Sequence, residues 1–248
     1  MAVRPLEPPS ARTRADGGDH VTARRRTRPT HNPRKGAPVR LQLALDAPEH
    51  LALVPRLTPF FDIIEVGTPV LKRFGLTAIT TVAELSGGAE ILADTKTVDG
   101  GALEAAMVFG AGASAMTVLA QASPATRTAT LEVARAHGGT VIFDTILDGT
   151  FDVATLADLD QDELWLALHA PSDARLAGNG TEDHIARVAD RRQRGCRVSL
   201  AGGIGRTNLE KVLAVAPDVI VIGSSVTGAA NPEKEASWLS TTVAQARG

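Results

Sequence analysis

Two carboxylates and an amine follow a short apolar run in the middle of the chain. Asp94 and Lys96 stand two positions apart at the end of residues 91–96, and Asp99 comes just before a pair of glycines. Side chains two positions apart on a β-strand point to the same face. An aspartate beside a lysine can bind a metal or polarise an oxygen, while each charge offsets the cost of burying the other. The alternative is a surface ion pair that ends a strand, since such pairs are common and weak.

Eight short apolar runs occur between residue 41 and the C-terminus, separated by segments with helical periodicity. Apolar strands that alternate with helices predict a parallel sheet covered on both faces. Eight such units in one α/β chain of this length predict a single (β/α)8 TIM barrel. The predicted strands are 41–46, 61–67, 90–96, 113–119, 140–145, 163–169, 197–203 and 218–225, and the clearest helices are 124–137, 182–194, 207–215 and 232–247.

Residues 1–40 differ in composition from the rest of the chain. They contain 10 Lys and Arg against 3 Asp and Glu, whereas residues 41–248 contain 16 against 25. Many arginines and prolines with almost no apolar periodicity predict a disordered basic extension over 1–40, followed by the catalytic barrel over 41–248. A basic arm could touch nucleic acid. Because it lacks aromatic residues and a folded module, we expect a solvated extension and no nucleic-acid partner.

The rest of the composition is that of an ordinary soluble protein, with 44% hydrophobic and 22% charged residues. The single cysteine, Cys196, excludes an internal disulfide and fits a reducing compartment. No apolar run approaches the roughly 20 residues that span a bilayer, and no apolar segment follows the arginines at 24–26 as in a signal peptide. We therefore expect a cytoplasmic protein without membrane contact.

Polar residues end several of the predicted strands. A barrel has its active site at the C-terminal ends of its strands, so these residues should converge. Asp46 ends the first run, and Glu65 lies in the second. Asp94 and Lys96 end the third, and His169 ends the sixth. Carboxylates, an ammonium and an imidazole at one barrel rim predict metal binding and acid–base chemistry.

The last two predicted strands end in small residues, Gly202 and Gly203 after the seventh and Gly223 and Ser224 after the eighth. Glycines there let backbone N–H groups approach an anion, and the loops after strands 7 and 8 are the usual phosphate site of this fold. Either pair alone could be a simple turn. Two pairs in these positions predict a phosphorylated substrate.

Several polar residues have other interpretations. Asp46 could be the N-cap of a helix that starts near Pro48, and His169 could be a core histidine with its hydrogen bonds satisfied. Asp144 ends the fifth run, where it could equally cap or be solvated, and we leave it outside the predicted site. Solvated helix surface is expected for His50, His137, His184 and the arginines at 191, 192 and 194.

Six segments in chain order resemble the 3-hexulose-6-phosphate synthase family. That family belongs to the orotidine monophosphate decarboxylase superfamily, whose mark is an Asp-x-Lys-x-x-Asp motif after the third strand, here Asp94, Lys96 and Asp99. The resemblance covers the predicted barrel. Its segments are LQLALD (41–46), IIEVGTP (63–69), ADTKTVD (93–99), HA (169–170), AGGI (201–204) and GAANP (228–232).

The resemblance implies a homodimeric, Mg²⁺-dependent aldehyde-lyase. Such an enzyme adds formaldehyde to D-ribulose 5-phosphate to give D-arabino-hex-3-ulose 6-phosphate, through an enediolate stabilised by the metal, and it also runs the reverse cleavage. By this resemblance, Glu65 and Asp94 hold the metal. Oxygen ligands suit Mg²⁺, with Mn²⁺ as a substitute, and leave room for substrate oxygens.

The same resemblance implies roles for the other residues. Lys96 would stabilise the enediolate with Asp46 beside it, and Asp99 would reach the site of the partner subunit. His169 would move the proton at the reacting carbon. This agrees with the chemistry, because an enediolate needs positive charge where negative charge develops and a base within reach of the C–H bond.

Two other functions stay open. The related 3-keto-L-gulonate-6-phosphate decarboxylase family forms a similar enediolate by losing CO2, and typically has arginines just after the histidine and in the last phosphate loop. Here residues 170–173 contain no arginine and the phosphate loop has Ser224 in its place, which favours the synthase. Pro171 and Ser172 nevertheless replace the Gly-aromatic or Gly-aliphatic pair expected of a synthase, and Ser224 and Ser225 replace its glycine-rich loop. The non-enzymatic alternative is a barrel that binds sugar phosphate or nucleic acid, and the intact Asp-Lys-Asp motif argues against it.

Overall fold

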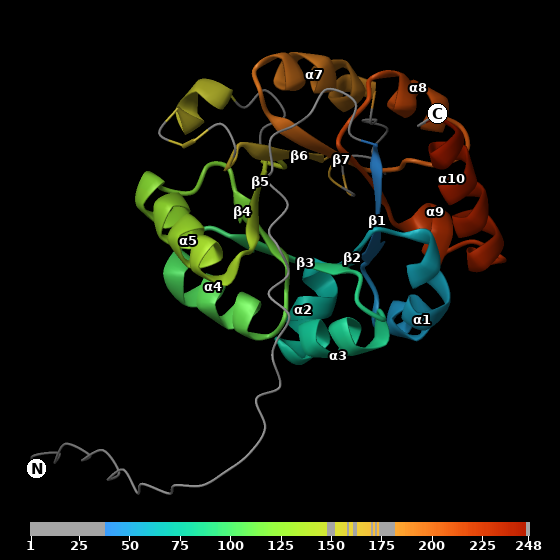
Figure 1. The fold of residues 1–248 in the computed structure, drawn as a ribbon, viewed down its shortest axis with the longest axis horizontal. Helices are drawn as coiled ribbons and strands as arrows, with labels where there is room; N and C mark the ends of the chain where they lie inside the picture. The colour runs from blue at the N-terminus through green and yellow to red at the C-terminus, as the bar shows by residue number, and fades with distance from the viewer. Residues whose placement is uncertain are drawn as a thin grey trace, which may run out of the picture. The chain divides into compact units, whose positions relative to one another are not determined.

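The strands close into a barrel in chain order. The computed structural model describes residues 38–147, 152–157, 159–160, 163–169, 171, 173 and 182–246. All eight strands are parallel, and β1 pairs with both β2 and β8, which closes the ring (Figure 1). The predicted (β/α)8 barrel is confirmed. The strands are β1 (Arg40–Leu45), β2 (Ile63–Val66), β3 (Glu90–Thr97), β4 (Ala115–Leu119), β5 (Thr140–Asp144), β6 (Trp165–His169), β7 (Arg197–Ala201) and β8 (Val219–Ile222).

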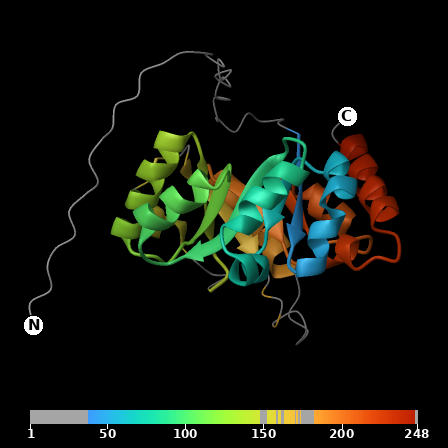
Figure 2. The ribbon, with the colours of Figure 1, turned by 90° about the horizontal axis from the view of Figure 1, so that it is seen from below.

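Helices surround the strands, as the side view also shows (Figure 2). The prediction for residues 124–137 matches α5, which begins where the Ser123 hydroxyl accepts the Thr126 N–H at 3.1 Å and ends at Gly138, φ 67°. The helix predicted at 207–215 is shorter than expected. The described helices are η1 (Pro48–Leu53), α1 (Val54–Leu57), η2 (Thr58–Phe60), α2 (Thr68–Phe74), α3 (Thr77–Leu85), α4 (Gly101–Gly110), α5 (Pro124–His137), η3 (Val153–Leu156), α7 (Glu182–Gln193), α8 (Leu209–Ala214), α9 (Ser224–Thr227) and α10 (Pro232–Ala246).

The core has two parts, one between strands and helices and a smaller one inside the barrel. The interior cluster centres on Trp165, whose indole N–H donates to the Ser199 hydroxyl at 2.7 Å. The Arg197 guanidinium lies 4.0 Å from the centre of the Trp165 ring. Other members of this cluster, among them Leu92 and Ile142, also line the pocket described below. The barrel interior therefore forms an apolar base beneath the site.

Two residues expected on solvated helix surface are buried instead. His184 and Arg191 lie on the inner face of α7 with Ile185 and Val188. A spacing of three or four residues puts all of them on one face of a helix, so the predicted exposure of His184 and Arg191 is wrong. His50 also has a structural role, since its Nδ1 accepts the backbone N–H groups of Asp46 and Ala47 at 3.2 and 3.3 Å.

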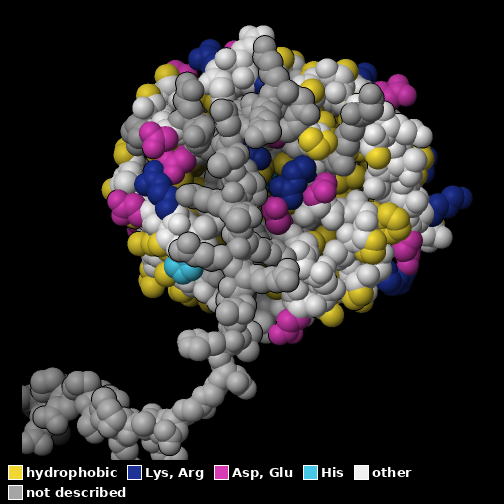
Figure 3. All heavy atoms as spheres, viewed as in Figure 1, with side chains coloured by type: hydrophobic (Ala, Val, Ile, Leu, Met, Phe, Trp, Pro, Cys, Tyr) yellow, Lys and Arg dark blue, Asp and Glu magenta, His cyan; other side chains and the backbone are white. Residues whose placement is uncertain are grey.

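On the surface, charges of opposite sign lie side by side. Figure 3 shows basic and acidic side chains next to one another on one face. Ion pairs such as Arg40–Glu90 also join charges of opposite sign. Among the described residues no helix is long and apolar enough to cross a membrane. Of the extension predicted over residues 1–40, residues 1–37 lie outside the described part of the chain. β1 begins at Arg40, one residue before the predicted start of the barrel.

Candidate active site

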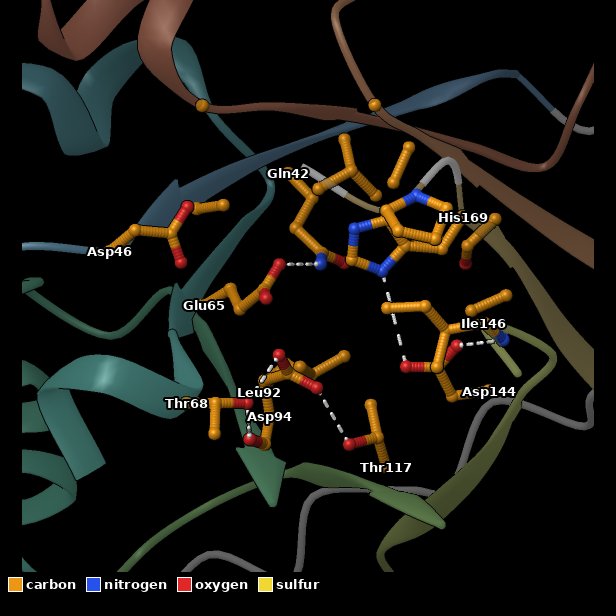
Figure 4. Close-up of a pocket in the computed structure, with 18 of the residues that line it drawn as sticks. Gln42, Asp46, Glu65, Thr68, Leu92, Asp94, Thr117, Asp144, Ile146 and His169 are labelled. Carbon is orange, nitrogen blue, oxygen red and sulfur yellow. Dashed lines mark hydrogen bonds and ion pairs between the residues drawn. The ribbon is translucent and has the colours of Figure 1, made fainter. Parts of the chain in front are cut away.

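A pocket of about 470 Å³ lies at the C-terminal ends of the strands. Every residue of the predicted site lines it except Asp99, which is exposed in the bend after β3. In Figure 4 three carboxylates reach the pocket from one side, those of Asp46, Glu65 and Asp94. Asp144 and His169 face them from the other side. The parallel barrel thus brings together side chains from β1, β2, β3, β5 and β6.

The centre of the site is an ammonium between two buried carboxylates. Lys96 Nζ lies 2.9 and 2.8 Å from the two oxygens of Asp94 and 2.9 Å from Asp144 Oδ2. Asp94 and Asp144 are only 6% and 1% exposed, so this is no surface ion pair. Burial alone would lower the pKa of Lys96, but the two carboxylates raise it above its ordinary value. Burial favours the neutral acid at Asp94, yet Lys96 and two threonine hydroxyls hold its pKa below the usual range.

Asp144 was left outside the predicted site, and the structure corrects this. Its Oδ1 accepts the Ile146 N–H at 2.9 Å, and its Oδ2 faces Lys96 and lies 4.0 Å from His169 Nδ1. One carboxylate oxygen thus accepts a backbone N–H of the loop that follows β5, and the other pairs with the ammonium. Asp144 therefore both anchors this loop and neutralises Lys96. A single aspartate after a strand carries no sequence signal that separates these roles.

Glu65 is enclosed and accepts a hydrogen bond from Gln42 Nε2 at 2.6 Å. Burial, and then the negative charges of Asp94 and Asp46, raise the pKa of Glu65 to about 8. The other amide atom, Gln42 Oε1, is buried without a hydrogen-bond partner. Sequence reasoning missed Gln42, since a polar residue within an apolar strand has no motif of its own.

Asp46 lies over the backbone of Gly67. A Cβ at Gly67 would be 2.3 Å from Asp46 Oδ1 and 2.6 Å from the Leu45 carbonyl oxygen, so only glycine fits there. The N-cap position of η1 is Ala47, and Asp46 caps nothing, so that alternative is wrong. Asp46 is among the exposed residues at the pocket mouth, yet partial desolvation, and then the charge of Asp94, raise its pKa.

His169 lies at the end of β6 and lines the pocket, with about a quarter of its side chain exposed. Burial lowers its pKa despite the opposing charge of Asp144, and the charge of Lys96 acts in the same direction as burial. The imidazole is therefore mainly neutral at neutral pH and can accept a proton.

The two predicted glycine loops lie at the rim of the pocket. Gly202 and Gly203 follow β7 with φ of 104° and 67°, which L side chains rarely adopt. Gly223 precedes the short helix α9, so Ser224 begins a helix and does not end the strand as predicted. Both loops line the pocket opposite the third strand. Ala170 and Ser172, which entered the comparison with decarboxylases, lie outside the described residues.

The donor set fits a hard divalent cation. Five carboxylates line the pocket against one ammonium, those of Asp46, Glu65, Asp94, Asp144 and Asp173. Burial, and then the neighbouring negative charges, raise the pKa of Glu65. Among the described residues, no group of three or more His, Cys, Asp or Glu surrounds a common point. Mg²⁺ needs fewer protein ligands, because it is commonly held by one or two carboxylates while water and substrate oxygens complete its shell. Glu65 and Asp94 could hold it.

Comparison with known proteins agrees with this geometry. Residues 39–238 match the orotidine 5'-phosphate decarboxylase / HUMPS family. The chain belongs to this family. A relative named 3-hexulose-6-phosphate synthase from Mycobacterium gastri is 33% identical over 83% of this chain and 100% of its own. The predicted resemblance, and the prediction of an enzyme of this superfamily, are confirmed.

Solved structures of other family members have the same barrel. A 3-hexulose-6-phosphate synthase from Salmonella typhimurium is 35% identical, with a TM-score of 0.77 over 84% of this chain and 100% of its own. A structure titled KGPDC from Streptococcus mutans in complex with D-R5P is 25% identical, with a TM-score of 0.75 over 85% and 99%. The family thus includes members of both reaction types considered above.

The raised pKa of Glu65 predicts a pH-dependent stability of the metal-free protein. A carboxyl whose pKa rises from 4.5 to about 8 on folding stabilises the fold fully below pH 4.5, and this contribution is lost as the pH rises through 8. Above pH 6.5 the lowered pKa of His169 no longer opposes the effect. Between pH 6.5 and 8 the free energy of unfolding should fall, as measured by urea denaturation in the presence of a chelator. Glu65→Gln should remove this slope, and an equal slope in both proteins would contradict the account.

Proposed function

We propose that the chain is a 3-hexulose-6-phosphate synthase, a lyase that joins formaldehyde to D-ribulose 5-phosphate and also cleaves the product. The observation that carries the proposal is the Lys96 ammonium between the buried carboxylates of Asp94 and Asp144. Burying these groups is costly for folding alone. Such an arrangement is suited to a reaction in which negative charge develops on a bound oxygen. The relatives that carry the synthase name support the choice of reaction.

The chain's own residues would carry the proton and charge changes. Neutral His169 takes the proton from C1 of the sugar phosphate, and the electron pair of that bond forms the enediolate. Lys96 stabilises the negative charge on its oxygens. C1 then bonds to the carbon of formaldehyde, whose oxygen takes up a proton, so the atoms of both reactants appear in the hexulose phosphate. Asp144, 4.0 Å from His169, favours the imidazolium that forms.

The remaining pocket residues would bind and orient. A Mg²⁺ ion held by Glu65 and Asp94 would supply additional positive charge beside the substrate oxygens. Backbone N–H groups of the glycine loops at 202–203 and 223–224 would take the phosphate. Asp46, fixed over Gly67, would accept a hydrogen bond from a substrate hydroxyl.

A sugar-phosphate decarboxylase is the second candidate, supported by the structural similarity to KGPDC. It differs in the group that leaves or joins at the reacting carbon, and arginine is expected in its last phosphate loop. Ser224, which lines the pocket there, supports the synthase.

The site should be completed by a second subunit. Val98, Leu103 and Met107 are 59%, 68% and 47% exposed, and Asp99, next to Val98 in the chain, is exposed and does not line the pocket. We propose that these apolar side chains form a homodimer interface that brings Asp99 to the partner's site. Leu103→Glu should then sediment as a monomer, while a dimer of unchanged stability would contradict this interface.

The protein would act in the reducing cytoplasm, a location with which the buried free thiol of Cys196 is consistent.

The direct test of the proposed function is an assay with D-ribulose 5-phosphate, formaldehyde and Mg²⁺. Chelator-sensitive loss of formaldehyde, with formation of a hexulose phosphate, is the expected result. Release of CO2 from 3-keto-L-gulonate 6-phosphate without any formaldehyde loss would favour the decarboxylase.

Removal of the proposed base should slow the reaction without unfolding the protein. His169→Ala should lower kcat by roughly 10²–10⁴-fold, the usual contribution of general acid–base catalysis. His137→Ala is the matched control, because His137 is exposed on α5 and does not line the pocket. Steady-state kinetics of both variants decide the matter, and full activity in His169→Ala would exclude the assigned role.

A further inference from the structure

The backbone of Lys96 is held in an unusual conformation. Its φ is 49°, in the left-handed region that a residue with a side chain rarely adopts. The pairing of β3 with β4 shifts register between Ala93 and Thr97, so a bulge lies at this point. Such a conformation is unfavourable and persists only where the surrounding structure holds it. Something must therefore fix Lys96 in place.

Thr117, in the middle of β4, is the residue that contacts this bulge. Its hydroxyl oxygen accepts the Lys96 N–H at 2.9 Å and donates its own proton to Asp94 Oδ1 at 2.8 Å. Its carbonyl oxygen accepts the Thr95 hydroxyl at 2.6 Å. Thr117 is 5% exposed, so water does not replace these bonds readily. One hydroxyl thus links the backbone of Lys96 to the carboxylate of Asp94.

Among the described residues, four hydrogen bonds reach the carboxylate of Asp94. Lys96 Nζ donates to both oxygens, Thr117 donates to Oδ1, and the Thr68 hydroxyl donates to Oδ2 at 2.8 Å. The single Thr68 hydroxyl proton is shared between this oxygen and the Asp94 carbonyl oxygen, so Thr68 fixes this one residue. Thr117 differs from Thr68 because it bonds both Asp94 and Lys96. It therefore sets the position of one relative to the other.

We propose that Thr117 is a positioning residue that sets the carboxylate of Asp94 and the ammonium of Lys96 for metal binding and enediolate formation. This inference rests on the proposed function, in which Asp94 holds Mg²⁺ and Lys96 stabilises the enediolate. Without the Thr117 hydroxyl, the bulge loses an acceptor for the Lys96 N–H, and Asp94 loses a donor that fixes its plane. Both groups then shift from the geometry that the reaction needs.

The test replaces Thr117 by residues that separate its hydroxyl from its shape. Thr117→Val keeps the branched shape and removes the hydroxyl, whereas Thr117→Ser keeps the hydroxyl and removes a methyl group. Thr130→Val is the matched control, because the Thr130 hydroxyl is fully buried on α5, donates to the Thr126 carbonyl at 2.8 Å and does not line the pocket. Mg²⁺ affinity is measured by calorimetry without substrate, and kcat and KM by the formaldehyde assay.

Thr117→Val should weaken Mg²⁺ binding and lower kcat by about 10- to 100-fold each, the usual effect of removing a group that orients a metal ligand. The loss should appear in kcat more than in KM, because the phosphate loops are untouched. Thr117→Ser should restore both quantities, and Thr130→Val should match the wild type. Wild-type Mg²⁺ affinity and kcat in Thr117→Val, or equal losses in Thr130→Val, would overturn the proposal.

The experiment distinguishes three outcomes: a variant that does not fold, a protein that lacks the proposed synthase activity, and a Thr117 hydroxyl that does not position Asp94 and Lys96. Should thermal denaturation show that Thr117→Val does not fold, Thr117→Ser still decides, because a packing role predicts loss of Mg²⁺ affinity and kcat in that variant and a positioning role predicts their retention. Absence of synthase activity in the wild type would reject the proposed function. The comparison of Mg²⁺ affinities would still test Thr117.

Discussion

The structure depends on an excess of negative charge around one partly buried ammonium. Five carboxylates line the pocket, those of Asp46, Glu65, Asp94, Asp144 and Asp173, and Lys96 is the only lysine or arginine among the described residues that line it. Burial, and then the neighbouring negative charges, raise the pKa values of Glu65 and Asp46, whereas Lys96 lowers that of Asp94. A divalent cation and an anionic intermediate would both be stabilised by this arrangement, since the first relieves the repulsion and the second meets the ammonium.

The barrel makes this charge distribution affordable. Parallel strands bring residues that are far apart in the chain to one rim, and the apolar interior around Trp165 supports them from below. Hydroxyl groups then fix the charged side chains, as Thr68 and Thr117 do for Asp94. The glycine loops after β7 and β8 leave space for an anion at the far side of the pocket. The apolar barrel interior thus stabilises the fold, while the C-terminal ends of the same strands carry the charged site.

Much of the site could be predicted because strand ends are visible in a sequence as polar residues after apolar runs. Asp46, Glu65, Asp94, Lys96 and His169 were found in this way, and all line the pocket. Asp144 was not predicted as a site residue, because a lone aspartate after a strand is equally consistent with a loop anchor. In the structure it anchors the loop and also pairs with Lys96. Gln42 and Thr117 lie inside strands, where polar residues have no periodic signature. The left-handed Lys96 is set by tertiary hydrogen bonds that no local pattern encodes. The buried His184 and Arg191 could have been recognised from their helical spacing with Ile185 and Val188.

The central claim is that this charged pocket removes a proton from C1 of a sugar phosphate and stabilises the resulting enediolate. The most direct measurement is proton exchange, followed by NMR, when D-ribulose 5-phosphate is incubated in D2O with the protein and Mg²⁺ but without formaldehyde. The account predicts that a C1 hydrogen exchanges for deuterium at a rate that depends on His169 and is abolished by a chelator. Absence of C1 exchange in a folded, Mg²⁺-loaded protein would contradict it.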